Sequence, residues 1–145
     1  MKPHLLDVNV LVALMWAPHE CHQRAQEWFA NHARFGWATC PLTEAGAVRI
    51  LSNPAFSRDA ATPQQALSVL TENLKRPSHQ FWPDAISITE AVGLVGVQLA
   101  GHRQVTDFYL LGLALHRKAR FATLDRGVAA VGATGSRVAE AITLI

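Results

Sequence analysis

The sequence predicts an α/β fold in which helices alternate with short strands of a mostly parallel sheet. Short apolar runs alternate along the chain with longer stretches whose apolar residues recur at helical spacing. Half of the residues are hydrophobic and only 17% are charged, which excludes intrinsic disorder and supplies a core. The 145 residues contain no repeat or low-complexity segment and suit one ordinary domain, so we treat 1–145 as a single unit.

Four short apolar runs are the expected strands, and a fifth closes the chain. They cover residues 4–8, 36–40, 80–82 and 121–124, with 141–145 as a final edge strand. A sheet of four to five strands follows from this count.

The longer periodic segments are the expected helices, and several carry start or stop signals. They cover residues 10–16, 20–34, 41–51, 62–74, 87–101 and 105–117. Pro41 and Pro63 suit the first helical position, and Thr62 with Gln65 forms a capping-box pattern. Asn53 before Pro54 ends the third helix, because the residue before a proline is pushed out of helical geometry.

Charge and cysteine content restrict the functional class only loosely. Thirteen Lys and Arg against eleven Asp and Glu give a net charge of +2, too near balance to predict a nucleic-acid partner alone. Cys21 and Cys40 cannot build a disulfide framework, which is typical of a reducing compartment. No stretch approaches the ~20 apolar residues needed to span a bilayer. We therefore expect a soluble, cytoplasmic protein.

Four acidic residues lie where water should be scarce. Asp7 and Asp125 each follow an apolar strand, whereas Glu44 and Asp107 each begin a helix and lead an apolar stripe at i+3, i+4 and i+7. Strand ends and the following helix starts meet at one edge of a parallel sheet, which is where such folds bind ligands. Four carboxylates gathered there would repel one another unless Mg²⁺ or Mn²⁺ were bound. Taken singly, however, each acid is better explained as a helix cap or a turn residue than as a metal ligand, and it is their shared position that favours a joint site.

The same residues resemble the motifs of one known family. The run 5–11 (Leu-Leu-Asp-Val-Asn-Val-Leu) resembles the first motif of PIN-domain ribonucleases, and particularly of the VapC toxins of bacterial toxin–antitoxin pairs. The segments 40–44, 101–110 and 122–127, which contain Glu44, Asp107 and Asp125, resemble the other three acidic motifs. The likeness runs along almost the whole chain, with no departure at the four acids.

The resemblance implies a three-layer α/β/α sandwich and Mg²⁺- or Mn²⁺-dependent endonucleolytic cleavage of RNA. It also implies a homodimer silenced by an antitoxin that covers the active-site groove. Asp7 and Asp107 would be the metal ligands, and Glu44 and Asp125 would complete the catalytic acidic cluster. Asn9 and Thr123 would contact these acids and hold them in position without touching the ion, although either could instead satisfy backbone groups at a turn.

Arginines near the motifs are candidates for contacts with the substrate. Arg103 and Arg126 lie in or beside predicted loops, where they could bind phosphates or simply be solvated. The basic group Arg117, Lys118 and Arg120 closes a predicted helix and would complement its dipole.

Two other functional classes stay open on sequence alone. A haloacid-dehalogenase-type phosphatase also begins with an Asp after its first strand, but Asn9 stands where its second Asp belongs. A non-catalytic scaffold that binds RNA or protein could also keep this fold.

Overall fold

The computed structural model describes residues 1–133 and 136–145, and its centre is a five-stranded parallel sheet. The strands are ordered β3-β2-β1-β4-β5, and every neighbouring pair is parallel. Their bounds are β1 (His4–Leu6), β2 (Trp37–Thr39), β3 (His79–Phe81), β4 (Arg120–Thr123) and β5 (Ile142–Leu144). All five expected strands are present, and the last is an edge strand as predicted.

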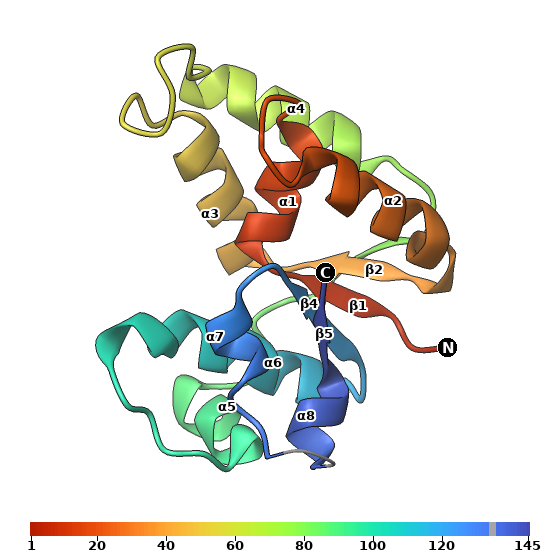
Figure 1. Cartoon of the computed structure of the whole chain (residues 1–145), viewed down its shortest axis with the longest axis vertical. Coiled ribbons are helices and arrows are strands. Elements are labelled where there is room, and N and C mark those ends of the chain that lie inside the picture. The colour runs from red at the N-terminus through yellow and green to blue at the C-terminus, as the bar shows by residue number, and fades with distance from the viewer. Residues whose placement is uncertain (134–135) are drawn as a thin grey trace.

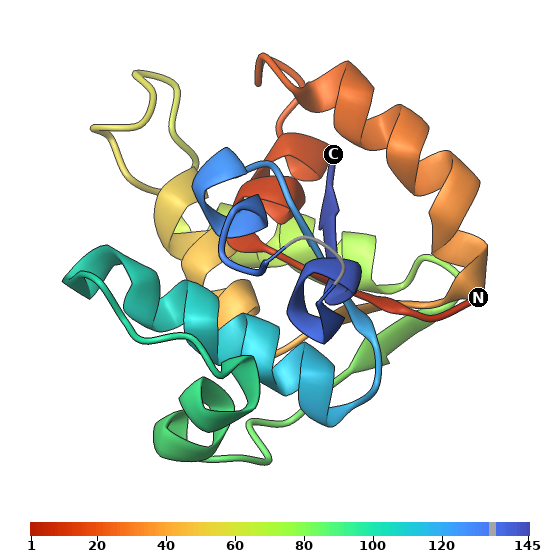
Figure 2. The same cartoon turned by 60° about the horizontal axis from the view of Figure 1, so that its bottom comes forward.

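Helices cover both faces of the sheet, which confirms the three-layer α/β/α architecture (Figures 1 and 2). One layer holds α1 (Val8–Met15), α2 (His22–His32), α3 (Pro41–Leu51) and α4 (Pro63–Leu74). The other holds α5 (Ile88–Val95), α6 (Val105–His116), α7 (Arg126–Ala129) and α8 (Arg137–Ala141). Short 3₁₀ turns, η1 (Ala33–Phe35) and η2 (His102–Gln104), precede β2 and α6.

The central strands are apolar on both sides because each side packs under a helical layer. Leu5 and Leu6 are neighbours in β1, point to opposite faces, and are both fully buried. Leu5 joins the core beneath α5 and α6, whereas Leu6 joins the core beneath α1 to α4. This two-sided burial produces the continuous apolar runs that predict a parallel sheet.

Most helix boundaries agree with the sequence, and the differences have local causes. The first strand ends at Leu6 rather than residue 8, because the Asp7 side chain caps α1, which begins at Val8. The expected helix 87–101 is wrong at its end: α5 stops at Val95, and Gly96 follows in the left-handed conformation with φ 70°. α7 and α8 are not predicted at all, since four or five residues are too few to show a helical period.

Among the described helices, none combines the length and the apolar character required to cross a membrane.

Candidate active site

The carboxyl ends of β1 and β4 place two of the acids side by side. These strands are hydrogen-bonded neighbours, with Leu6 opposite Ala122. Asp7 directly follows β1, and a single residue separates the end of β4 from Asp125. The expected meeting of strand ends at one edge of the sheet is therefore present for this pair.

Asp7 is a buried helix cap whose two carboxylate oxygens are both used. The residue is 5% exposed. Its Oδ1 accepts a hydrogen bond from the Val8 amide at 2.7 Å, and its Oδ2 accepts one from the Thr123 hydroxyl at 2.7 Å. Burial raises the pKa of Asp7, the two hydrogen bonds oppose that shift, and the charge of Asp125 adds to it. Asp7 is thus held rigidly and near another anion.

Thr123 connects Asp7 to the turn that follows β4. Its hydroxyl donates to Asp7 and accepts from the Asp125 amide at 3.0 Å. Asn9 accepts from the Leu124 amide at 3.2 Å, and its amide group lies 3.5 Å from the Thr123 hydroxyl. Asp125 caps α7 through the Gly127 amide at 2.7 Å. The capping interpretation is therefore true of Asp7 and Asp125, and the caps fix where both carboxylates lie.

Asp107 lies in the first turn of α6 and lines the same cavity as Asp125. It is half-buried, and among the described residues no side chain or amide hydrogen-bonds its carboxylate. Burial, together with the charges of Asp7 and Asp125, raises its pKa to about 6. Asp107 therefore carries a negative charge that the rest of the described protein does not compensate.

Glu44 is held by a different set of contacts. It lies in the first turn of α3, and its Oε2 accepts a hydrogen bond from the buried Thr39 hydroxyl at 2.8 Å. That hydroxyl is also 2.8 Å from Nε2 of His79. Burial lowers the pKa of His79, although the charge of Glu44 acts in the opposite direction. Glu44 is not among the charges that act on Asp7 or Asp107.

A small cavity of about 160 Å³ opens beside the acids on the α6 side. Asp107, Asp125 and Arg103 all line it. Arg126 is exposed on α7 and does not line the cavity. Of the two arginines expected to contact the substrate, Arg103 therefore lines the cavity beside the acids, and Arg126 lies outside it.

Comparison with known proteins identifies the family. The sequence model of the PIN-domain family matches residues 4–133 of this chain. The chain belongs to the PIN-domain family. Ribonuclease VapC38 of Mycobacterium tuberculosis (strain H37Rv) is 46% identical over 125 residues, 86% of this chain and 86% of that protein. Ribonuclease VapC39 of the same strain is 41% identical over 133 residues, 90% of this chain and 94% of that protein.

A solved structure supports the same fold for this PIN domain. The crystal structure of VapBC2 from Rickettsia felis, bound to a DNA fragment from their promoter, matches with a TM-score of 0.57 and 15% sequence identity. The match covers 86% of this chain and 89% of that chain. Membership of the PIN family also sets aside the phosphatase alternative.

The donor set of this PIN domain fits a divalent cation. Carboxylate oxygens suit Mg²⁺ and Mn²⁺, and Mg²⁺ commonly uses only one or two of them together with waters. Among the described residues the only ion pair is Lys75–Glu72, so no cationic side chain neutralises Asp7, Asp107 or Asp125. In the described part of the chain, no three His, Cys, Asp or Glu side chains already lie close enough to hold an ion among them. Because Mg²⁺ can be held by one or two carboxylates, these observations leave room for a site with fewer than three protein ligands.

Two residues beside the acids escaped the sequence analysis, namely Thr39 and His79. Thr39 ends β2 as Thr123 ends β4, each after an alanine, and each donates a hydrogen bond to an acid. This repeated Ala-Thr at a strand end is a signal that could have indicated Thr39. His79 carries no such signal, because its contact depends on the pairing of β3 with β2.

Proposed function

We propose that this PIN domain is a Mg²⁺- or Mn²⁺-dependent endoribonuclease and the toxin of a toxin–antitoxin pair. The observation that carries the proposal is the Asp107 carboxylate, which lines one cavity with Asp125 and forms no ion pair in the described part of the chain. The relatives of 41–46% identity, each called a ribonuclease VapC, support RNA as the substrate. The resemblance to VapC toxins adds an antitoxin partner and a homodimer to the proposal.

The chain's own residues would position the ion and the scissile phosphate. Asp7 and Asp107 would hold the ion, with Asp7 fixed by Thr123 and Val8. When bound, such an ion lowers the pKa of the attacking water and offsets the charge that develops on the phosphate. Asp125 and Glu44 would orient water, because both carboxylates are anchored by one oxygen only. Arg103, at the rim of the cavity, would bind a neighbouring phosphate.

The first prediction is that Asp7→Asn and Asp107→Asn each reduce RNA cleavage at least 100-fold, since either change removes a charged ligand of the ion. Purified variants are incubated with RNA and Mn²⁺, and the new 5′ ends are counted by sequencing. Asp59→Asn is the matched control, because Asp59 lies in an exposed loop away from the acids and should retain full activity. Isothermal titration with Mn²⁺ should show weakened binding only in the two site variants.

The same experiment separates the enzyme from a non-catalytic scaffold. Cleavage by Asp7→Asn at the rate of the unmodified protein would overturn the assignment of the site. RNA binding without any cleavage, in the unmodified protein with Mn²⁺ or Mg²⁺ present, would favour the scaffold.

A further inference from the structure

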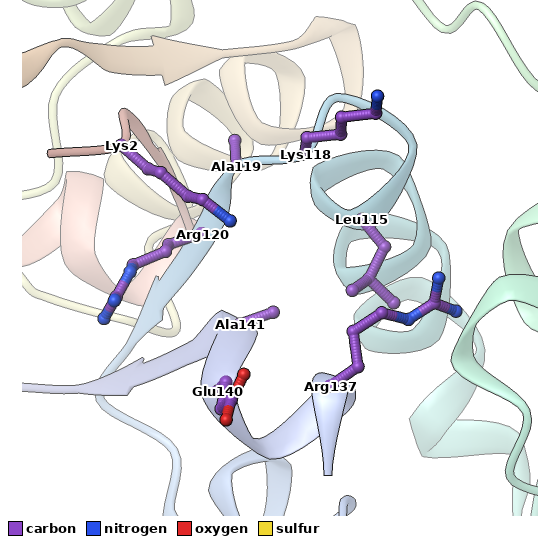
Figure 3. Close-up of a pocket in the computed structure, with 8 residues that line it drawn as sticks. All are labelled: Lys2, Leu115, Lys118, Ala119, Arg120, Arg137, Glu140 and Ala141. Carbon is purple, nitrogen blue, oxygen red and sulfur yellow. The ribbon is translucent and has the colours of Figure 1, made fainter.

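A second hollow lies at the opposite edge of the sheet from the acids. It has a volume of about 340 Å³, and its apolar wall is formed by Leu115, Ala119 and Ala141. Figure 3 shows Lys2 and Arg120 on one side of the opening and Leu115 and Arg137 on the other. Lys2 precedes β1 and Arg120 begins β4, so the hollow is at the amino ends of the strands. The acidic cluster is at their carboxyl ends.

The hollow concentrates positive charge. Lys2, Lys118, Arg120 and Arg137 line it together with a single acid, Glu140, which gives a net charge of +3. No ion pair involves any of these five groups in the described part of the chain. Arg137 donates to a neutral partner, the Leu94 carbonyl, at 3.2 Å, so its charge stays uncompensated. The Arg120 charge also contributes to lowering the pKa of the buried His4 nearby.

The helix dipole of α6 does not account for this group of cations. Two carbonyls in the last turn of α6 are already bonded to backbone amides: Lys118 N–H donates to the Leu115 carbonyl at 3.0 Å, and Ala119 N–H donates to the Ala114 carbonyl at 2.9 Å. Lys2 and Arg137 come from other elements altogether. Lys118 itself has a φ of 55°, a conformation that favours glycine or asparagine, so a lysine there is retained at a conformational cost. The dipole of α6 therefore accounts for the presence of a cation at Lys118 at most.

We propose that this cationic hollow binds backbone phosphates of the RNA substrate outside the cleaved bond. The inference rests on the proposed ribonuclease function and extends it to a second binding surface. Four cationic side chains around one hollow suit a chain of phosphates, which supplies several charges at once. An apolar wall of small side chains accommodates sugar edges without selecting a base. The hollow therefore adds affinity and no sequence preference.

The two surfaces lie at opposite ends of the same strands. β4 has four residues, so Arg120 is separated from Thr123 by about 10 Å along the strand. Because most of β4 is buried, an RNA that contacts both surfaces follows the outside of the protein and spans more than this distance. Because the hollow acts on binding alone, its loss should raise KM for RNA and leave kcat unchanged.

The second prediction concerns the double variant Lys2→Gln/Arg120→Gln. In EDTA, where cleavage is blocked, its affinity for labelled oligouridylate should fall on the order of tenfold, and the slope of log K against log salt should decrease by about 1.4, the value for two lost single-strand phosphate contacts. With Mn²⁺ the same variant should show a raised KM and an unchanged kcat. Unchanged thermal unfolding checks that the variant is folded.

The matched control is Arg24→Gln/Arg34→Gln, which removes the same charge from exposed positions on α2 and η1. Equal losses of affinity in the two double variants would overturn the inference, because the effect would then be one of net charge. Saturable binding of uridine monophosphate at the hollow with unchanged affinity for oligouridylate would also overturn it, in favour of a small-anion site. If the unmodified protein cuts no RNA and the hollow variant still loses affinity for oligouridylate, the proposed function fails and the binding surface stands.

Discussion

His4 shows how a single side chain makes the stability of this fold depend on pH. It lies in β1, is 4% exposed, and its Nε2 is 3.1 Å from the Thr143 hydroxyl of β5. Its other ring nitrogen, Nδ1, is buried without a hydrogen-bond partner among the described residues. Burial, together with the charges of Arg120 and His32, lowers its pKa from 6.5 to about 4. The folded protein therefore holds His4 neutral.

The third prediction follows from the sign of this shift. Between pH 6.5 and pH 4 the unfolded chain binds a proton at His4 that the folded chain does not, so stability falls as the pH falls through this range, by at most about 3 kcal/mol from this residue. Denaturant unfolding is measured from pH 8 to pH 4. His4→Gln should flatten the curve while lowering stability at pH 8, because it disturbs a packed site.

The control for this prediction is His116→Gln, which changes an exposed histidine at the end of α6. It should leave the pH dependence as it is in the unmodified protein. A His4→Gln curve as steep as that of the unmodified protein would show that other groups cause the acid sensitivity.

At the same scale, sequence reasoning identified acids more readily than their supports. The apolar neighbours of Asp7 and Asp107 mark them as unusual in the sequence itself. Thr123 and Asn9 were expected to support the acids because they lie two residues from Asp125 and Asp7, and Thr123 does contact Asp7. The link from His79 through Thr39 to Glu44 joins three segments of the chain and has no local pattern.

The α5–α6 pair illustrates how elements are held together by close backbone approach. A Cβ placed on Gly112 of α6 would lie 2.6 Å from both Cα and Cβ of Ala91 in α5. Ala91 is fully buried, so α5 and α6 pack here with no room for a methyl group. Gly93, two residues further along α5, has no heavy atom within 4 Å of such a Cβ. The same change from glycine to alanine can therefore be made in this helix pair at a crowded position, Gly112, and at an open position, Gly93.

The fourth prediction is that Gly112→Ala destabilises the protein by about 1–3 kcal/mol, because overpacking outweighs the gain in helix propensity. Gly93→Ala is its matched partner and should stabilise by up to about 1 kcal/mol, since alanine is the better helix former and nothing obstructs it. Urea denaturation of both variants gives the two values. Stabilisation by Gly112→Ala would show that α5 and α6 pack less closely than described.

Elements were predictable where a residue with a fixed backbone preference sets the boundary. Pro41 and the Thr62 capping box begin α3 and α4 at the expected positions. The end of α5 was missed because Val97 and Leu99 continue the apolar pattern beyond Gly96, and only the left-handed φ of Gly96 ends the helix. Periodicity alone does not distinguish a helix from an apolar loop that packs on the core.

On the scale of the whole molecule, a net charge of +2 conceals two edges of opposite charge. Asp7, Asp107 and Asp125 gather where the strands end, and the cations of the hollow gather where the strands begin. Composition could not show this separation, because it depends on which residues flank neighbouring strands. Asp107 caps no helix, and the charges of Asp7 and Asp125 help to raise its pKa, so its carboxylate works against the stability of the fold. Such local conflict with stability is typical of functional sites.

The fifth prediction tests this conflict through Asp107→Asn. In EDTA at pH 7 the variant should melt about 3 °C above the unmodified protein, because removing a half-buried charge repelled by Asp7 and Asp125 is worth on the order of 1 kcal/mol after solvent screening. Since the pKa of Asp107 is raised to about 6 in the folded state, lowering the pH from 6 toward 4 protonates it there first and stabilises the unmodified protein. The gap between the two melting temperatures should therefore narrow over that range.

Mn²⁺ should reverse the order of the two proteins at pH 7, because an ion that binds only the folded state raises the melting temperature with its concentration. The unmodified protein should gain several degrees at saturating Mn²⁺, and Asp107→Asn should gain little. Asp59→Asn should follow the unmodified protein with and without the ion. If Asp107→Asn melts lower than the unmodified protein in EDTA, the carboxylate supports the fold, and the repulsion that makes a cation necessary at this edge is absent.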